Sequence, residues 1–185
     1  MDDIVRQAIA KWPDVPDCYG WLGLDARGNW YLRDAQAQAA GPFPTLTGGA
    51  NPASKGSLLQ HAKLIDFIAR NYEGDADGRW FFQNGPQRVY VELEATPLIW
   101  RVDAAPGWAV TAHTGRSARV QRCVLDEQGR LYLHTDLGFG LVHSQDMVHA
   151  AEALEQGWGV PEAWPAADLP GRFAYVCSPA ALQKK

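Results

Sequence analysis

The sequence lacks the features of nucleic-acid-binding and membrane proteins. It has 17 basic and 21 acidic residues, a formal net charge of −4, and no basic stripe that would release counterions from a nucleic acid. No apolar run reaches the roughly 18–20 residues that a membrane span requires. The start, Met1–Ile4, is acidic, whereas a signal peptide begins with basic residues. We therefore expect a cytoplasmic protein with neither a nucleic-acid nor a membrane partner.

Cysteine and serine are used sparingly, and this argues against several kinds of site. The three cysteines, Cys18, Cys123 and Cys177, are far apart and odd in number. No two of them have the spacing of a metal site or a redox pair, and an odd count argues against a disulfide framework. No serine lies in the turn pattern of a nucleophile elbow. The sequence therefore predicts no metal and no cofactor.

Tryptophan is abundant, and the length is ordinary. The chain has 185 residues, 46% of them hydrophobic and 21% charged, which is typical of a globular protein. This length suits one sizeable domain or two small, closely packed ones. Eight tryptophans are too many for all to be core centres, so we expect some of these amphipathic rings to line a groove or an interface.

One short phrase occurs three times, at residues 25–32, 75–82 and 126–133. Each copy opens with Asp, has Gly at its fourth position and continues into aromatic and aliphatic residues. Asp first and Gly fourth are the preferences of a type I turn, and the residues that follow favour strands. The phrase therefore predicts a β-hairpin that recurs along the chain.

Two helices are predicted between these hairpins and after them. Ser57 and Gln60 form a capping box, and apolar residues then follow at helical spacing to about Tyr72. Ser144 is expected to cap a second helix that stops at Gly157. A strand-like ending is expected at 172–177. Antiparallel hairpins with segregated helices predict an α+β protein with two main helices.

The first candidate site is the sequence Lys55-Gly56-Ser57. It follows a connection rich in Ala, Gly and Pro over residues 34–56 and precedes the predicted helix, whose exposed N–H groups would attract an anion. Lys55 would add a positive charge. There is no second glycine at phosphate-loop spacing, so this is not a Walker motif. A capping role for Ser57 alone is the alternative.

The second candidate site is a group of cationic and aromatic residues. Arg88 and Tyr90 share the predicted polar face of the strand 87–94, and Trp80 lies shortly before the turn that feeds it. A cation beside aromatic planes could hold a planar or anionic ligand. A solvated strand face would give the same pattern.

The histidines offer weaker candidates for catalysis. His61 falls within the apolar stripe of the predicted helix, where a core histidine is the simpler interpretation. His143, Asp146 and His149 are spaced by three, but their directions fan over roughly 120° of a helix and no fourth ligand is evident. A structural role is favoured both for His61 and for the group of His143, Asp146 and His149.

The order of these parts resembles that of proteobacterial families of unknown function. The resemblance covers roughly residues 19–145. It is carried by Gly28-x-Trp30-Tyr31, Lys55-Gly56-Ser57, Leu64–Ile68, Asp77-Gly78-x-Trp80-Phe81-Phe82, Arg88–Glu92 and Glu94–Pro97. It implies a duplicated α+β core whose C-terminal half is similar to a pleckstrin-homology-like barrel. It also implies a signalling role and a ligand, a nucleotide among the candidates, in the crevice between the halves.

These observations lead to three hypotheses. The leading one is a non-enzymatic binding or signalling module with an α+β subdomain at 1–96 and a pleckstrin-homology-like meander plus helix at 97–185. It would take a small anionic ligand between its halves, with Lys55-Gly56-Ser57 receiving the charge and Trp80, Arg88 and Tyr90 forming a wall. The second is a protein-interaction module that uses residues 34–56 or the Trp-rich tail at 158–170. The third is a hydrolase or transferase that uses His61 or the cluster of His143, Asp146 and His149.

Overall fold

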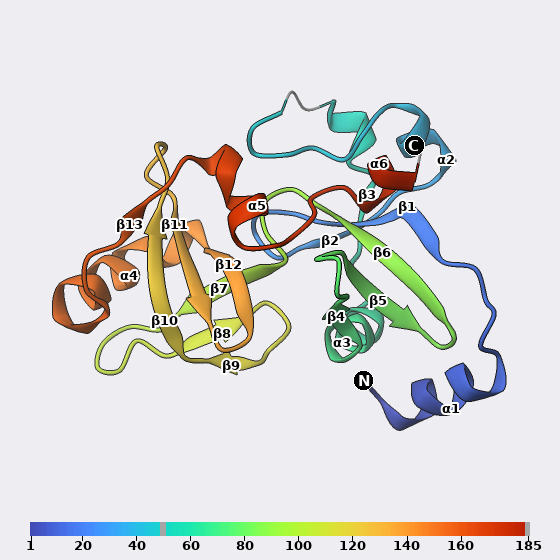
Figure 1. Ribbon diagram of the computed structural model, residues 1–185, viewed down its shortest axis with the longest axis horizontal. Helices are drawn as coiled ribbons and strands as arrows, with labels where there is room; N and C mark the ends of the chain where they lie inside the picture. The colour runs from blue at the N-terminus through green and yellow to red at the C-terminus, as the bar shows by residue number, and fades with distance from the viewer. Residues whose placement is uncertain (49–50, 184–185) are drawn as a thin grey trace. The chain divides into compact units, whose positions relative to one another are not determined.

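The computed structural model describes residues 1–48 and 51–183 and divides into two compact units. The first unit comprises Met1–Asp25, Asn29–Ala95 and the C-terminal residues from Ala174 onward. The second comprises Ala26–Gly28 and Thr96–Phe173. The protein is a mixed α+β chain with two sheets and few helices, and one of the sheets is curled (Figure 1). The division at residues 96 and 97 into separate domains stays a prediction.

The first unit contains a six-stranded sheet in the order β3-β2-β1-β6-β5-β4. Its strands are β1 (Cys18–Leu24), β2 (Trp30–Leu32), β3 (Ser57–Leu58), β4 (Tyr72–Gly74), β5 (Trp80–Asn84) and β6 (Gln87–Leu93). Its helices are α1 (Asp3–Lys11), α2 (Ala35–Ala39), the 3-10 turn η1 (Pro52–Ser54), α3 (Ala62–Arg70) and α6 (Pro179–Gln183). All neighbouring strands are antiparallel except β1 and β6, which are parallel.

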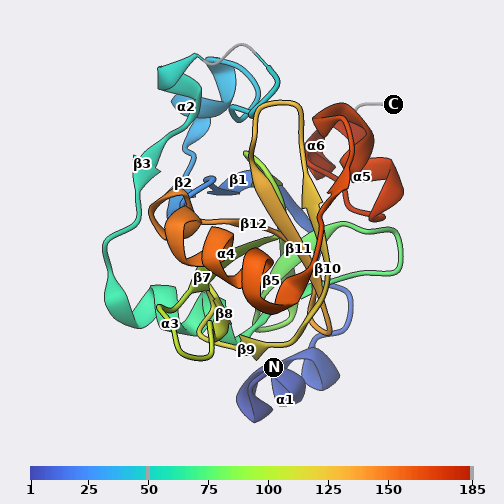
Figure 2. The same cartoon turned by 90° about the vertical axis from the view of Figure 1, so that its left-hand side faces the viewer.

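The second unit contains a seven-stranded sheet in the order β13-β10-β11-β12-β7-β8-β9. Its strands are β7 (Leu98–Val102), β8 (Val110–Ala112), β9 (Ser117–Ala118), β10 (Val120–Leu125), β11 (Leu131–Thr135), β12 (Gly138–Val142) and β13 (Glu162–Ala163). Its helical segments are η2 (Ser144–Asp146), α4 (Met147–Ala153), the π-helical turn η3 (Leu154–Trp158), η4 (Ala166–Asp168) and α5 (Leu169–Arg172). Figure 2 shows the long antiparallel hairpin of β10 and β11 in this unit.

The three Asp–Gly phrases form turns with a common hydrogen-bond pattern. The Oδ1 atoms of Asp25, Asp75 and Asp126 accept the backbone N–H four residues further on, at 2.8, 2.9 and 2.9 Å. The glycine at the fourth position has a φ of +82°, +77° and +74°, the left-handed region that side chains disfavour. In each turn the Asp side chain therefore accepts a backbone hydrogen bond, and the Gly adopts a positive φ that other residues disfavour.

Each sheet has a densely packed aromatic core. In the first unit Trp30 meets Tyr72 edge-on at 5.2 Å, and Phe67 meets Phe82 edge-on at 5.4 Å between ring centroids. In the second unit Trp100 is fully buried and its indole N–H donates to the Leu133 carbonyl at 3.1 Å. Burying such rings contributes much of the hydrophobic stabilisation of each unit.

The predicted helix starting at Ser57 is wrong in its first turn. Ser57 and Leu58 pair with β2 instead, and α3 begins at Ala62 with His61 as its N-cap. The His61 imidazole is exposed and its Nδ1 accepts from the Leu64 N–H at 3.2 Å, so His61 is not a core residue. Pairing with β2 satisfies backbone groups of residues 57 and 58, which outweighs a local capping preference.

Three other local predictions also needed correction. The face of β6 that alternation assigned to solvent is covered, because Tyr90 and Glu92 are buried along with Val91 and Leu93. This strand lies between two others, and its second half, from Tyr90 to Leu93, is buried on both faces, whereas Arg88 in its first half is exposed. The second helix begins as η2 with His143 at its N-cap, rather than at a Ser144 cap. Residues 172–177 form the end of α5 and a turn, with no strand.

Candidate functional site

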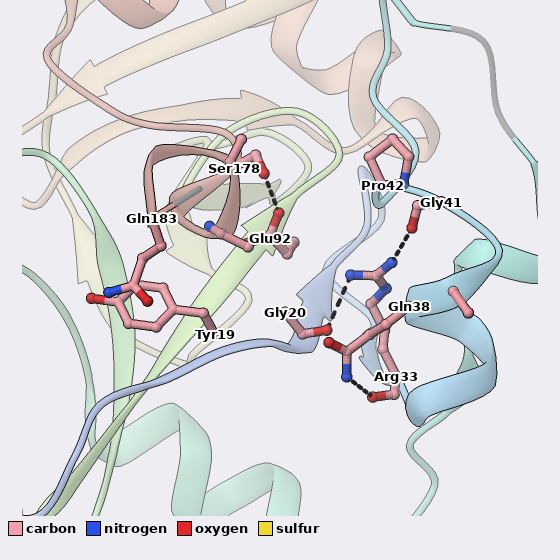
Figure 3. Close-up of a pocket in the computed structure, with 12 residues that line it drawn as sticks. Tyr19, Gly20, Arg33, Gln38, Gly41, Pro42, Glu92, Ser178 and Gln183 are labelled. Atoms are coloured by element: carbon pink, nitrogen blue, oxygen red, sulfur yellow. Dashed lines mark hydrogen bonds between the residues drawn. The ribbon is translucent and has the colours of Figure 1, made fainter. Parts of the chain in front are cut away.

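One candidate site is a cavity of about 680 Å³ in the first unit (Figure 3). It lies between α2 and α6, over the ends of strands β1, β2 and β6. Polar side chains at its wall include Tyr19, Arg33, Gln38, Glu92, Ser178 and Gln183. All of its lining residues belong to the first unit. A cavity of this size is within the range of about 300–1,000 Å³ that small-molecule sites occupy.

An irregularity in strand β1 shapes one side of this cavity. The register between β1 and β6 shifts between Cys18 and Leu22, and Gly20 there has a φ of +79°. A Cβ at this position would lie 3.0 Å from the amide oxygen of Gln38. Strand irregularities of this kind re-aim backbone groups and are frequent beside functional sites. Here the Gly20 carbonyl turns toward Arg33 and accepts from its Nη1 atom at 3.0 Å.

Arg33 places a buried positive charge at the cavity wall. Only 3% of this residue is exposed. Its guanidinium donates to the carbonyl oxygens of Ser54, Gly20 and Gly41, at 2.7, 3.0 and 2.6 Å, and more weakly to Ala37 at 3.5 Å. Within residues 1–48 and 51–183 no carboxylate lies within 4.0 Å of it. Burial lowers the pKa of Arg33, and the charge of Glu92 partly offsets this.

Glu92 places a buried negative charge at the same cavity. This residue is 2% exposed and lies near the end of β6. The Ser178 hydroxyl donates to its Oε2 atom, and the backbone N–H of Ala180 donates to Oε1 at 3.0 Å. Figure 3 shows Glu92 beside Ser178 on one side of the cavity and Arg33 beside Gly41 on the other. The cavity is therefore lined by charges of opposite sign.

Two short helices from distant parts of the chain complete the wall. α2 is capped by Asp34, whose carboxylate accepts the Ala37 N–H at 2.8 Å, and Gln38 of this helix donates to the Arg33 carbonyl at 3.2 Å. α6 is held against β6 because the Leu93 N–H donates to the Cys177 carbonyl at 2.8 Å. Burial raises the pKa of the Cys177 thiol to about 11, which disfavours its reactive thiolate form at neutral pH.

The predicted anion site at Lys55-Gly56-Ser57 lies at the β3 side of the sheet. Lys55 contacts two carboxylates, Glu94 at 3.0 Å and Asp25 at 3.6 Å, and its ammonium lies 4.6 Å from the Tyr31 ring centroid. Burial alone would lower the pKa of Lys55, but the hydrogen bond to Glu94 and the charges of Glu94 and Asp25 together raise it. Gly56 has a φ of +85°, and a Cβ there would lie 2.3 Å from the Leu32 carbonyl oxygen. These contacts already neutralise the lysine charge.

The predicted wall of Trp80, Arg88 and Tyr90 lies on strands β5 and β6. The Arg88 guanidinium lies 4.8 Å from the Phe81 ring centroid at a shallow, open depression of about 500 Å³. Tyr90 is 1% exposed, and its hydroxyl donates to Asp75 at 3.1 Å. Trp80 packs against Tyr72 rather than facing the depression. Three acidic residues, Glu73, Asp75 and Asp77, line the same depression and oppose an anion there.

The two predicted groups are not brought together. Strands β2 and β1 lie between β3 and β6 in the sheet, roughly 14 Å from one strand axis to the other at a spacing of about 4.8 Å, and Lys55 reaches the β6 side only at Glu94, beyond the end of that strand. Tyr90 does connect with the cavity through Tyr19, because the two rings stack at 4.5 Å between centroids and Tyr19 lines the cavity. The predicted wall and the predicted anion site at Lys55-Gly56-Ser57 therefore have different neighbouring residues and do not form one site.

The residues named for the catalytic hypothesis have structural partners. His143 is buried and its Nδ1 accepts from the Gln145 N–H at 3.2 Å. Asp146 accepts from the Arg101 guanidinium and from the Val102 N–H. His149 lies on α4, and the described residues contain no group of His, Cys, Asp and Glu that could hold a metal ion.

Sequence reasoning missed Arg33 and Glu92 as site residues. Arg33 stood at the end of a predicted strand, and Glu92 stood on its predicted polar face. Both positions look solvated in the sequence. A charged residue among strand residues is the only signal that could have drawn attention to them, and nothing in the pattern places residues 174–183 over β6.

The fold and cavity define a two-sheet α+β protein with a candidate small-molecule site. Over residues 1–180 the chain matches the model of a family described as protein of unknown function (DUF2946), and it belongs to this family. The curated proteins include no match. Among solved structures, the chain resembles a DUF1285 family protein from Silicibacter pomeroyi DSS-3, with a TM-score of 0.50, 14% identity and coverage of 99% of both chains. This likeness concerns the fold alone. Within the described residues, no helix has the length and apolar character to cross a bilayer.

Proposed function

We propose that the protein is a binding module that takes a small anionic ligand in the cavity between α2 and α6 of its first unit. One observation carries this proposal: Arg33 is a buried cation at the cavity wall whose hydrogen bonds reach only carbonyl oxygens among the described residues. Carbonyl dipoles solvate a guanidinium without cancelling its charge, so the cavity keeps a positive potential beside Arg33. A planar guanidinium is also a preferred partner of carboxylates and phosphates.

The proposal moves the anion site from the residues that the sequence suggested. Lys55 has two carboxylate neighbours, whereas Arg33 has none within 4.0 Å in the described part of the chain. The anion attraction of a cation falls when a carboxylate is already in contact with it. Arg88 stays a candidate for a weaker site, since it is exposed and shares its depression with acidic residues.

The experiment that tests this proposal fills the cavity without touching Arg33. Ala39 of α2 is an exposed residue at the cavity wall, and Ala35 on the same helix is exposed but does not line it. Thermal-shift measurements would compare Ala39→Phe with Ala35→Phe against nucleotides, sugar phosphates, inorganic phosphate and carboxylic acids. A ligand at about 100 times its Kd adds about 2.7 kcal/mol of stability. Each kcal/mol raises the Tm by about 2–4 °C for a chain of 150–250 residues, so such a ligand gives a readily measured shift.

We expect at least one anionic compound to stabilise the wild type and the Ala35→Phe variant but not Ala39→Phe. A compound that stabilises all three proteins equally would place the anion elsewhere. Absence of any shift in a well-folded wild type would refute anion binding and would favour the protein-interaction hypothesis.

The resemblance of residues 97–185 to a pleckstrin-homology-like unit with a signalling role stays part of the proposal. Support comes from seven strands in one curled sheet, with α4 after β12. The parallel pairing of β12 with β7 distinguishes this sheet from an entirely antiparallel meander.

A further inference from the structure

We infer that the anion bound in the cavity between α2 and α6 carries a hydroxyl group next to its charged group, as a hydroxy acid or a glycerol phosphate does. Gln38 is the residue that recognises this hydroxyl. The inference rests on the proposed function, because it takes Arg33 as the residue that attracts the anion. To that function it adds the chemical class of the ligand and a residue that determines specificity.

The side-chain amide of Gln38 has a defined orientation. Gln38 belongs to α2, and its Nε2 atom donates to the backbone carbonyl of Arg33 at 3.2 Å. A carbonyl oxygen only accepts hydrogen bonds, so the NH₂ end of the amide must face it. Figure 3 shows the amide nitrogen at the Arg33 carbonyl and the amide oxygen on the side of Gly20. The amide therefore presents its acceptor, Oε1, in a fixed direction.

This acceptor is not used by the protein. Within residues 1–48 and 51–183, no N–H or O–H group donates to the Oε1 atom of Gln38, and the atom keeps contact with solvent. Gln38 also lines the cavity. A hydroxyl group of a ligand can therefore donate to Oε1 without breaking a hydrogen bond inside the protein, so the gain is not offset by a buried group left unpaired.

The acceptor of Gln38 and the cation of Arg33 meet at Gly20. The Gly20 carbonyl accepts from the Arg33 Nη1 atom at 3.0 Å, and a Cβ at Gly20 would lie only 3.0 Å from the Gln38 Oε1 atom. Both groups lie on the same side of the cavity in Figure 3. A ligand whose anionic group faces Arg33 therefore brings its adjacent atoms within reach of Gln38.

The nearby charge favours a hydroxyl over an ammonium group as the donor. Arg33 is 3% exposed, and like charges repel more strongly away from bulk water. An ammonium group at Gln38 would lie beside this cation, and the neutral amide would not offset the repulsion. Glu92, the acidic residue of the wall, lies on the other side of the cavity beside Ser178 (Figure 3). A neutral hydroxyl group donates to Oε1 without this cost.

The test uses three matched carboxylates on the full chain. Propionate, lactate and alanine differ only at the carbon next to the carboxylate, which carries hydrogen, a hydroxyl or an ammonium group. Isothermal titration calorimetry should give lactate a Kd about fivefold lower than propionate, the effect of one net hydrogen bond. Alanine should bind no more tightly than propionate. Glycerol 3-phosphate and n-propyl phosphate make the same comparison for a phosphate, and glycerol 3-phosphate should bind more tightly.

A variant assigns the hydroxyl preference to Gln38. Gln38→Met keeps a similar length and removes the acceptor, so the Kd ratio of propionate to lactate should fall to less than about twofold. A ratio within one variant cancels any general change in the cavity. The matched control is Gln36→Met, because Gln36 lies on the same helix, is exposed and does not line the cavity. That control should keep the wild-type ratio.

The outcomes separate this inference from the proposed function. Equal binding of each hydroxylated compound and its plain partner, or tighter binding of alanine than of lactate, would overturn the hydroxyl preference and leave the anion site standing. Binding of inorganic phosphate but of neither series would do the same. A Gln38→Met variant that keeps the wild-type ratio would overturn the assignment to Gln38. If that variant fails to fold, the wild-type comparison decides. Failure of every anionic compound to bind would remove the proposed function itself.

Discussion

The two units treat the charge of an arginine in opposite ways. In the first unit Arg33 is buried and bonds to carbonyl oxygens. In the second unit the Arg101 side chain is 53% exposed and binds both carboxylate oxygens of Asp146, at 2.5 and 3.0 Å. Asp146 neutralises Arg101, whereas carbonyl dipoles leave the charge of Arg33 intact. Under the proposed function, the cation that the fold has only solvated attracts the ligand, whereas the one that is already paired contributes stability.

The Asp–Gly turns of the two units differ in whether a distant segment of the chain packs against them. Gly78 and Gly129 occupy the same position of the same type of turn, with φ of +77° and +74°. A Cβ at Gly78 would lie 2.2 Å from the carbonyl oxygen of Ala174, whereas one at Gly129 would meet nothing within 4 Å. Local conformation is therefore equal at the two positions, and only the first is packed against a distant segment.

Replacing Arg33 should produce the largest effect and would test the first contrast. We expect Arg33→Ala to lower the free energy of unfolding by about 3–5 kcal/mol, because buried carbonyl groups lose their donor and Glu92 loses an opposite charge. Urea denaturation measures this. Arg101→Ala is the control, with an expected loss of about 1 kcal/mol because that side chain is half-exposed. Equal losses from the two variants would contradict the distinction between the units.

The same substitution at Gly78 and at Gly129 tests whether packing against a distant segment distinguishes the two turns. Gly129→Ala should cost about 1 kcal/mol, the penalty for a side chain at positive φ. Gly78→Ala should cost about 2–4 kcal/mol, since the methyl group must also displace the backbone at Ala174. Thermal or urea unfolding gives both values. Similar losses would mean that the segment from Ala174 onward is not tightly packed against the turn.

The ion pair of the second unit should respond to pH. The Arg101 guanidinium lowers the pKa of Asp146 below its ordinary value, with burial opposing and the Val102 N–H assisting. The stability from a lowered carboxyl pKa is complete above the unfolded value of about 3.9 and is lost as the pH falls through the folded value. Asp146→Asn should lower stability at neutral pH by about 1.5–3 kcal/mol and flatten the dependence below about pH 4.

Urea unfolding of the wild type and of Asp146→Asn at a series of pH values measures this effect. Asp3 is a suitable control, because it pairs with Arg6 and both side chains are exposed. Asp3→Asn should leave the acid dependence nearly unchanged. A wild-type profile identical to that of Asp146→Asn would show that the pair does not contribute to stability.

Parts of the fold were predictable because they depend on neighbouring residues. The three Asp–Gly turns follow from an Asp that accepts backbone N–H groups and a Gly that adopts positive φ. Periodicity indicated most of α3 and β6. The α+β class followed from these elements. Each of these depends on contacts within a few residues.

Other parts depended on contacts that no local pattern encodes. Ser57 joined an edge strand rather than a helix because β2 supplied partners for its backbone. The parallel pairing of β1 with β6 joins segments about seventy residues apart, an arrangement that hydrophobic alternation does not specify.

The sequence by itself determined the turns and the α+β class, because short-range sterics and hydrophobic periodicity decide them. The excess of aromatic residues is a property of the composition and was visible at once. Only the tertiary structure decided which charges are paired and which line a cavity. Arg33 and Glu92 look like solvated strand residues in the sequence, and their role depends on α2, on the irregularity at Gly20 and on the return of residues 174–183 to β6. Charges act over space rather than along the chain, so the candidate site emerged only when these distant segments were placed together.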